Sequence, residues 1–255
     1  MLIGIDPQYR VAVRPGGQPV DMSGQVPLGG LTVGLGPEVS VARMSAELVD
    51  AAAAQVGGRV AAVRELSGLQ LVVRAAAVLR HRETCRFDAA TGAELSFAQD
   101  SLVGRTPEGA QVYPQISPAV IGLVATQDGQ RVLLGRNAQR AQYFSLIAGY
   151  VELGETIEAA FVRELREETG VLGTDVRYWG SQPWPMSGSV MLGVTATCLD
   201  PTAVGPTDGE LVETRWVTRA ELAQLPLPAP GSIAHTMISW WANHQEHLEK
   251  GGNHD

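Results

Sequence analysis

Residues 149–171 read GYVELGETIEAAFVRELREETGV, and this stretch decides the fold. Its first part is a glycine-bounded loop that ends at Gly154. From residue 156 to residue 169 apolar side chains recur with helical spacing, which predicts an amphipathic helix. Gly170 follows at once, and glycine is the residue that most often ends a helix. We therefore expect a loop followed by a short, sharply bounded helix.

Three glutamates crowd one face of this predicted helix. Glu164 precedes Glu167 by three residues and Glu168 by four, and side chains at these spacings are neighbours on a helix. Such like charges destabilise a helix, whereas a bound divalent cation removes the repulsion and prefers oxygen ligands of this kind. The alternative interpretation is a solvated acidic face with ordinary ion pairs, to which Arg163 contributes.

The same stretch resembles the Nudix box: a glycine, five residues, a glutamate, seven residues and then R-E-U-x-E-E-x-G-U, where U is aliphatic. All fixed positions of that pattern are matched, by Gly149, Glu155, Arg163, Glu164, Leu165, Glu167, Glu168, Gly170 and Val171. The resemblance implies an α+β fold, namely a Nudix α/β/α sandwich, and hydrolysis of a nucleoside diphosphate linked to another group. It also implies that Glu155 and Arg163 pair to brace the loop.

The resemblance implies Mg²⁺ or Mn²⁺ as cofactor, and the chemistry explains why acids are needed. A diphosphate bridge repels nucleophiles, so cations must hold its oxygens while a metal-bound water of lowered pKa supplies hydroxide. A carboxylate that is not fully engaged accepts the water's proton; Glu168 is the first candidate and Glu167 the second. The metal ligands that the resemblance implies are Glu164, Glu167, Glu168, Glu210 and the carbonyl oxygen of Ala148.

A second motif follows the predicted helix. Residues 181–189 read SQPWPMSGS and resemble the S-Q-P-W-P-F-P-x-S motif of the NADH pyrophosphatase (NudC-like) subfamily. Two positions depart, because Met186 stands where the subfamily has Phe and Ser187 where it has Pro. A methionine covers a flat ring less rigidly than an aromatic residue does, so the preference for nicotinamide stays open. The alternative interpretation is a stiff loop that buries a tryptophan.

Other segments resemble the same subfamily. Residues 113–121, YPQISPAVI, resemble its Y-P-R-x-D-P-A-V-I strand, and residues 231–234, GSIA, resemble its late G-S-I-A segment. Tyr150 matches an aromatic residue that stacks on a base ring. Tyr113 is expected from the partner subunit of a homodimer. The implied substrate contacts are Tyr113, Tyr150, Gln182, Pro183, Trp184, Pro185, Met186, Ser187, Gly188, Ser189 and Ala234, with Arg64 as the N-terminal candidate.

The remaining sequence predicts three parts. These are a small α+β domain at residues 1–82, a connector at residues 83–112 and the Nudix domain at residues 113–255. An alanine-rich helix is expected in the first part, at residues 44–54. The elements expected in the last part are a hairpin of residues 119–125 and 131–134, strands at 189–199 and 213–217, and a helix at 233–247.

The connector lacks the zinc ribbon of the subfamily, which consists of two C-x-x-C pairs. The corresponding positions here are Cys85, Asp88, Arg105 and Glu108. A structural zinc site needs four nitrogen or sulfur donors, and this set does not supply them. We therefore expect no structural zinc, and a connector hairpin held by Arg105 and its acidic neighbours.

The composition of the chain indicates its cellular compartment and excludes some classes of binding partner. The 255-residue chain has two cysteines, no apolar run long enough to span a membrane and no signal-peptide pattern, so we expect a cytoplasmic protein. Its net charge of −8 disfavours broad binding to nucleic acid or anionic lipid. The segment of residues 59–86 is locally basic and contains Arg59, Arg64, Arg74, Arg80, Arg82 and Arg86. The simplest interpretation is a solvated surface. The functional interpretation is that these arginines steer an RNA 5′ end.

Three functions are compatible with these residues. The leading interpretation is an NAD(H) diphosphatase that converts NADH or NAD⁺ into NMNH or NMN plus AMP, with removal of NAD caps from RNA 5′ ends as a further activity. The second is a Nudix pyrophosphatase acting on ADP-ribose, a dinucleoside polyphosphate or a CoA derivative, which Met186 and Ser187 favour. The third is a non-catalytic nucleotide sensor, which the intact box acids disfavour. A serine nucleophile is a poor alternative because no G-x-S-x-G elbow is present.

Overall fold

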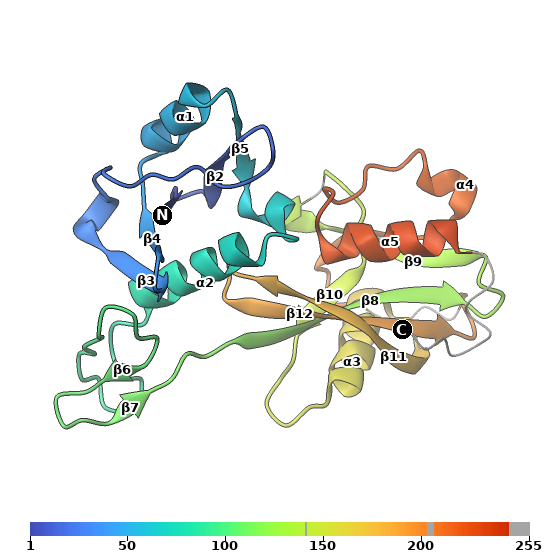
Figure 1. Cartoon of the computed structure of the whole chain (residues 1–255). Coiled ribbons are helices and arrows are strands. Elements are labelled where there is room, and N and C mark those ends of the chain that lie inside the picture. Colours follow the sequence, from blue (N-terminus) through green and yellow to red (C-terminus); the bar gives the residue numbers. More distant parts are fainter. Residues whose placement is uncertain (141, 203–206, 245–255) are drawn as a thin grey trace. The chain divides into compact units, whose positions relative to one another are not determined.

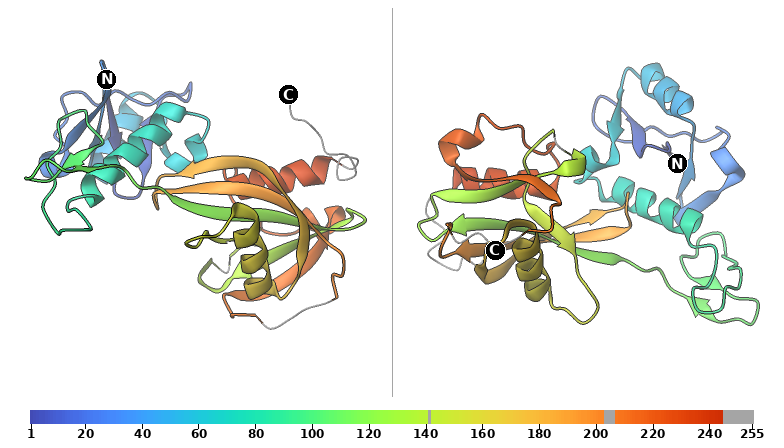
Figure 2. Two further views of the ribbon diagram at one scale, coloured as in Figure 1. Left: turned by 90° about the horizontal axis from the view of Figure 1, so that it is seen from below. Right: turned by 180° about the vertical axis from the view of Figure 1, so that it is seen from behind.

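The computed structural model describes residues 1–140, 142–202 and 207–244, shown in Figures 1 and 2. The chain divides into two compact units. The first comprises Met1–Ile116 and Pro183–Ser189, and the second comprises Ser117–Gln182 and Val190–Asp255. No helix among the described residues is long and apolar enough to cross a membrane.

The first unit is a small α+β structure. Its regular elements are β1 (Leu2–Ile5), β2 (Arg10–Val13), η1 (Leu28–Gly30), β3 (Thr32–Gly36), β4 (Val39–Arg43), α1 (Ala46–Gln55), β5 (Arg59–Ala62), η2 (Val63–Leu66), α2 (Gln70–Thr84), β6 (Gly104–Arg105) and β7 (Gln111–Val112). A three-stranded sheet has the order β1-β4-β3, with β1 parallel and β3 antiparallel to β4, and β2 pairs with β5. The expected alanine-rich helix is confirmed as α1, which begins with Ser45 as its N-cap.

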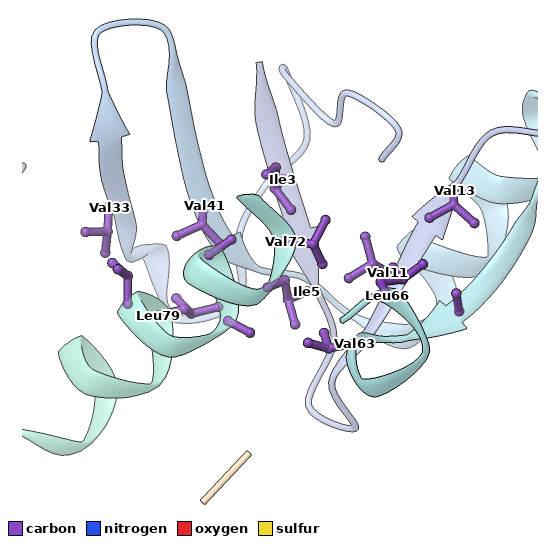
Figure 3. Close-up of a cluster of buried hydrophobic side chains, with 14 residues drawn as sticks. Ile3, Ile5, Val11, Val13, Val33, Val41, Val63, Leu66, Val72 and Leu79 are labelled. Carbon is purple, nitrogen blue, oxygen red and sulfur yellow. The ribbon is translucent and has the colours of Figure 1, made fainter. Parts of the chain in front are cut away.

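Helix α2 covers the three-stranded sheet through its apolar side. Val72, Ala76 and Leu79 are fully buried and belong to one cluster with Ile3 and Ile5 of β1 (Figure 3). The helical spacing of these apolar positions places them on a single face, which buries them together against the sheet. The opposite face of α2 carries the exposed arginine Arg74.

The connector forms a hairpin, but the expected ion pairs do not hold it. Strands β6 and β7 pair antiparallel, with Arg105 opposite Gln111. In the amide orientation that satisfies both of its polar atoms, the Gln111 oxygen accepts hydrogen bonds from both Arg105 terminal nitrogens, at 2.8 and 3.1 Å. Asp88 instead accepts a hydrogen bond from Thr91, at 2.6 Å. The expected pairing of Arg105 with acids is therefore wrong for the described residues, since a neutral cross-strand partner is closer.

The second unit is a six-stranded sheet with helices on both faces. Its elements are β8 (Ser117–Thr126), β9 (Arg131–Asn137), η3 (Ala138–Arg140), β10 (Ile147–Tyr150), α3 (Ile157–Thr169), β11 (Gly173–Trp184), β12 (Ser189–Cys198), β13 (Leu211–Thr218), α4 (Arg219–Leu222) and α5 (Ile233–Asn243). The sheet order is β11-β12-β8-β9-β13, and β10 pairs with β8. The predicted strands are thus confirmed, with bounds shifted by up to three residues.

The alternation of buried side chains along β8 explains why helices cover both faces of the sheet. Ile121 and Leu123 pack in one cluster with α5, whereas Val120 and Val124 pack in another with α3. Successive side chains of a strand point to opposite faces, so α3 and α5 cover opposite faces of the sheet, as Figure 1 shows. The predicted α/β/α sandwich is confirmed.

Local signals set the ends of the central elements. The Thr156 hydroxyl accepts a hydrogen bond from the Ala159 amide and caps α3, and Gly170 ends the helix in a left-handed conformation with φ of 72°. The predicted hairpin is confirmed, because Ala125 of β8 pairs with Val132 of β9. Helix α5 begins at Ile233 as expected but ends at Asn243, because His244 is its C-cap in an extended conformation; the predicted residues 245–247 lie outside the described part of the chain.

Candidate active site

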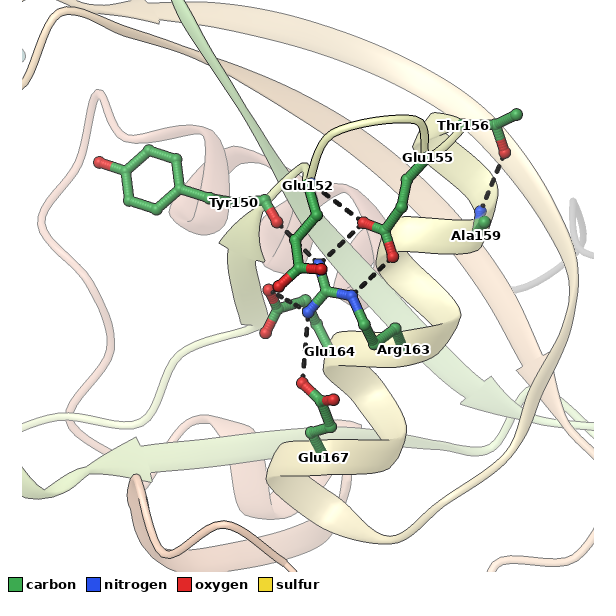
Figure 4. Close-up of polar contacts among 8 residues, drawn as sticks. All are labelled: Tyr150, Glu152, Glu155, Thr156, Ala159, Arg163, Glu164 and Glu167. Carbon is green, nitrogen blue, oxygen red and sulfur yellow. Dashed lines mark hydrogen bonds and ion pairs between the residues drawn. The ribbon is translucent and has the colours of Figure 1, made fainter.

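Arg163 is the centre of the polar network that joins the box loop to α3 (Figure 4). Its Nε and Nη2 donate to the two carboxylate oxygens of Glu155, at 2.7 and 2.9 Å, and Nη2 also donates to the Tyr150 carbonyl oxygen, at 2.9 Å. The hydrogen bond to Glu155 raises the pKa of Arg163 and lowers that of Glu155. The expected brace between Glu155 and Arg163 is confirmed.

The same guanidinium also holds two of the predicted metal ligands. Its Nη1 donates to Glu164 at 2.9 Å and to Glu167 at 3.2 Å. The Glu167 side chain is half exposed, whereas that of Glu164 is only 15% exposed. Burial raises the pKa of Glu164, the Arg163 guanidinium opposes that rise, and the charges of Glu167 and Glu210 add to it.

Because Gly149 of β10 has no side chain, the Glu164 carboxyl group can pack against the backbone of this strand. A Cβ atom built on Gly149 would lie only 2.0 Å from Glu164 Cδ, which no side chain tolerates. Gly149 pairs with Val120 of β8, and Ala148, the predicted carbonyl ligand, precedes it on the same strand. The glycine of the box therefore brings the Glu164 carboxylate beside the backbone that carries Ala148.

Among the described acids of the second unit, Glu168 has the largest shift in pKa. It is only 5% exposed, and its carboxylate forms no hydrogen bond or ion pair with the described residues. Burial raises its pKa to about 8, and the charges of Glu164, Glu210 and Asp208 contribute to the rise. A buried carboxylate surrounded by other acids lacks the compensation that a buried charge requires.

The acids fit a divalent cation in chemistry and charge. Carboxylate oxygens are the ligands that Mg²⁺ and Mn²⁺ prefer, and a cation would relieve the repulsion around Glu168. In the part of the chain that the structure describes, no three His, Cys, Asp or Glu side chains yet converge as a coordination group. Glu164 and Glu167 instead accept hydrogen bonds from Arg163.

Asp208 is an acid of this group that the sequence did not single out. Its amide donates to the Glu167 carbonyl oxygen at 2.9 Å, and its carboxylate accepts from the Glu210 amide at 2.9 Å. These bonds place the segment before β13 next to the end of α3. An acid two residues before Glu210 was the available sequence signal, but only the fold shows that it faces Glu168.

Both polar atoms of the Gln182 side-chain amide form hydrogen bonds with the segment that begins α5. Its Nε2 donates to the Gly231 carbonyl oxygen and its Oε1 accepts from the Ile233 amide, both at 2.7 Å. Ala234, in the first turn of the helix, is buried. Gln182 thus ties β11 to the start of α5, the helix whose first turn contains Ala234.

Residues 183–189 of the second motif belong to the first unit. Met186 packs against the buried cluster of β1 and α2, and the hydroxyls of Ser187 and Ser189 lie 2.8 Å apart. Pro183 is exposed and Trp184 is partly buried, while Pro185 is buried. Gly188 has a positive φ of 75°, which suits the turn between β11 and β12.

The two tyrosines among the predicted substrate contacts are exposed but lie in different units. Tyr113, in the first unit, is 59% exposed and its hydroxyl contacts the Gln111 amide. Tyr150, in the second, is 55% exposed, and Figure 4 shows its ring pointing away from Arg163. Arg64 is exposed in η2 of the first unit. The predicted metal-binding glutamates all lie in the second unit. That Tyr113 and Arg64 contribute to the same site stays a prediction.

Comparison with known proteins points to one family. Residues 116–238 match the NUDIX domain. The NAD-capped RNA hydrolase NudC of Mycobacterium bovis is 38% identical over 188 residues, which are 68% of this chain and 60% of that protein. The protein of the same name from Deinococcus radiodurans is 39% identical over 145 residues, covering 55% and 51%. The chain thus spans about 60% or less of the length of these curated relatives.

A solved structure supports the fold. The crystal structure of a NUDIX hydrolase from Nitrosomonas europaea matches with a TM-score of 0.50 and 21% identity, covering 64% of this chain and 93% of that chain. At this identity the match supports the fold alone.

Proposed function

We propose, from the match of residues 116–238 to the NUDIX domain, that this chain hydrolyses the diphosphate bond of NADH or NAD⁺. The products are AMP and NMNH or NMN, and NAD caps on RNA 5′ ends are further substrates. The similarity to proteins named NAD-capped RNA hydrolase supports this substrate class. The single observation that carries the chemistry is Glu168, a buried carboxylate among other acids with its pKa raised to about 8.

We assign the cation to the cluster of glutamates in the second unit. Nudix hydrolases generally use divalent metals, and Mg²⁺ or Mn²⁺ would be held by Glu164, Glu167, Glu168, Glu210 and the Ala148 carbonyl oxygen. The bound metal supplies charge neutralisation of the diphosphate and a water of lowered pKa. A carboxylate oxygen of Glu168 accepts the proton of the attacking water. The surroundings of Glu168 support that role, because its carboxylate forms no hydrogen bond or ion pair with the described residues and a carboxylate that is not fully engaged can accept a proton.

Other residues orient the substrate in this proposal. Arg163 fixes the box loop through Glu155 and the Tyr150 carbonyl, which leaves the Tyr150 ring exposed for stacking on a base. Gln182 holds the start of α5, so that the backbone at Ala234 keeps a defined position. We further propose a homodimer in which Tyr113 contributes to the site of the partner subunit.

One observation favours a second substrate class. The Met186 side chain packs against the hydrophobic cluster of the first unit, and that packing competes with its covering a nicotinamide ring. The same Nudix chemistry could then act on ADP-ribose or a dinucleoside polyphosphate. The non-catalytic sensor is the weakest alternative, because the box acids are all present.

Product analysis tests the substrate. Purified protein with Mg²⁺ or Mn²⁺ is incubated with NADH, NAD⁺, ADP-ribose, a diadenosine polyphosphate and an NAD-capped RNA, and the products are separated by chromatography. The proposal expects AMP with NMNH or NMN as the fastest products among the small substrates, and a 5′-monophosphate RNA from the capped one. Faster turnover of ADP-ribose or the polyphosphate would favour the second class, and no turnover on any compound would support the sensor.

A further inference from the structure

Asp208 connects helix α3 to the segment that begins β13, and all of these residues belong to the second unit. Its backbone amide donates to the Glu167 carbonyl oxygen and its carboxylate accepts from the Glu210 amide, both at 2.9 Å. Gly209, between Asp208 and Glu210, has a positive φ of 85°, which lets the chain turn so that the Glu210 amide meets the Asp208 carboxylate. Asp208 is therefore bonded both to α3 and to a predicted metal ligand outside that helix.

The bond to Glu167 anchors this turn at the end of α3. The last carbonyl oxygens of a helix lack a donor within the helix. The Val171 amide, four residues beyond Glu167, donates to the Thr169 hydroxyl oxygen at 3.2 Å. The Asp208 amide supplies the donor for the Glu167 carbonyl oxygen. Because this bond comes from the backbone, a substitution that changes only the Asp208 side chain leaves the anchor in place.

The backbone of Glu210 is held from two sides, whereas its side chain is not held. Its amide donates to Asp208, and its carbonyl oxygen accepts from the Ala138 amide at 2.9 Å. The Glu210 side chain is exposed, and it forms no hydrogen bond or ion pair with the described residues. The place of its carboxylate therefore depends on the backbone. A backbone that is already fixed reduces the entropy that is lost when the carboxylate binds a ligand.

We propose that Asp208 is a positioning residue that holds Glu210 in place for the divalent cation. This inference rests on the proposed function, which assigns Glu210 to that cation. Asp208 acts through the Glu210 amide and is not itself a metal ligand. The hydrogen bond needs an acceptor oxygen and not a charge, so a neutral oxygen at the same place should perform the same role.

Mn²⁺ binding to the full-length protein tests this assignment. Dissociation constants are measured by electron paramagnetic resonance for Asp208→Ala, which removes the acceptor, and for Asp208→Asn, which keeps the acceptor and removes the charge. We expect Asp208→Ala to weaken Mn²⁺ binding about tenfold, as is typical when a residue that orients a metal ligand is lost. Asp208→Asn should weaken it less than about threefold, because an exposed charge contributes little.

Asp128→Ala is the matched control. The Asp128 carboxylate accepts the same kind of hydrogen bond, from the amide two residues further on, at 3.0 Å. That bond lies in the turn between β8 and β9, which carries none of the predicted metal ligands. Asp128→Ala should therefore leave Mn²⁺ binding unchanged, which shows that losing such a bond in any turn does not lower the affinity.

A second background separates positioning from a general loss of structure. Asp208→Ala and Asp208→Asn are measured again in protein that carries Glu210→Ala. We expect the two dissociation constants to differ by less than about twofold there, because the carboxylate that Asp208 positions is missing. Thermal melting in EDTA establishes the folding of each variant. Asp208→Leu, which keeps the bulk of the side chain without an acceptor, serves if Asp208→Ala unfolds.

Three results would overturn the proposal. One is equal weakening by Asp208→Ala and Asp208→Asn, which would assign the effect to charge or to direct ligation. Another is a difference between these variants that persists in the Glu210→Ala background. The third is unchanged Mn²⁺ affinity in Asp208→Ala while the wild type binds Mn²⁺ and hydrolyses NADH, which would leave the proposed function intact. A wild-type protein that binds no Mn²⁺ would instead contradict the proposed function, and this inference with it.

Discussion

The carboxyl group of Glu164 lies directly on the backbone of Gly149, so that a methyl group at residue 149 would come within 2.0 Å of Glu164 Cδ. The first fixed residue of the box and its first helical acid are thus complementary in shape. The contact explains why a strand residue without a side chain must face α3 at this point.

Gly149→Ala should disable the site. The added methyl displaces the Glu164 carboxylate, and we expect the rate on NADH to fall by about two orders of magnitude, with an overpacking cost of about 1–3 kcal/mol in the free energy of unfolding. Gly180→Ala is the control, because a Cβ at residue 180 meets nothing within 4 Å. Equal activity of the two variants would show that the position of Glu164 does not matter.

Glu168→Gln should stabilise the metal-free protein in a pH-dependent way. The folded-state pKa of about 8 lies above the ordinary value of 4.5, so the folded protein resists ionisation. The neutral carboxyl is tolerated below pH 4.5, and stability is lost as the pH rises from there through about 8, by at most about 5 kcal/mol. Chemical denaturation in EDTA should therefore show little effect of the substitution at pH 5 and a clear gain at pH 9. A gain that is independent of pH would contradict the burial argument.

Arg163→Ala should weaken both the fold and the site. It removes the partner of Glu155, Glu164 and Glu167 at once, and we expect a loss of about 2–4 kcal/mol in the free energy of unfolding. Arg163→Lys should rescue little, since an ammonium cannot bond both oxygens of Glu155 and the Tyr150 carbonyl. Denaturation of Arg166→Ala, an exposed arginine on the same helix, provides the control. A loss no larger than the control's would mean that the network is incidental.

Gln182→Ala should separate substrate binding from catalysis. Both hydrogen bonds to the start of α5 disappear, so KM for NADH should rise about tenfold while kcat changes less. Gln182→Glu should behave no better, because one of its oxygens would face the Gly231 carbonyl. Gln224→Ala, at an exposed glutamine, is the control in steady-state kinetics. A fall in kcat with unchanged KM would place Gln182 nearer the reacting atoms than we propose.

Local signals made much of the second unit predictable. Thr156 and Gly170 mark the two ends of α3, and the alternation of β8 around Leu123 requires packing on both faces of the sheet. Long-range relationships were not predictable in this way. The approach of Asp208 to Glu168 and the hydrogen bond from the Ala138 amide to the Glu210 carbonyl oxygen depend on how distant segments fold together. The predicted pairing of Arg105 with acids is wrong because the side chain of the cross-strand residue Gln111 accepts its hydrogen bonds.

The central claim is that acids around Glu168 hold the cation that hydrolysis requires. The most direct measurement titrates Mn²⁺ into metal-free protein and follows bound Mn²⁺ by electron paramagnetic resonance together with NADH turnover, for the wild type and for Glu168→Gln. We predict that binding and turnover rise together in the wild type and that the substitution weakens the first and abolishes the second. Turnover of NADH in EDTA, or unchanged binding and turnover in Glu168→Gln, would contradict the account.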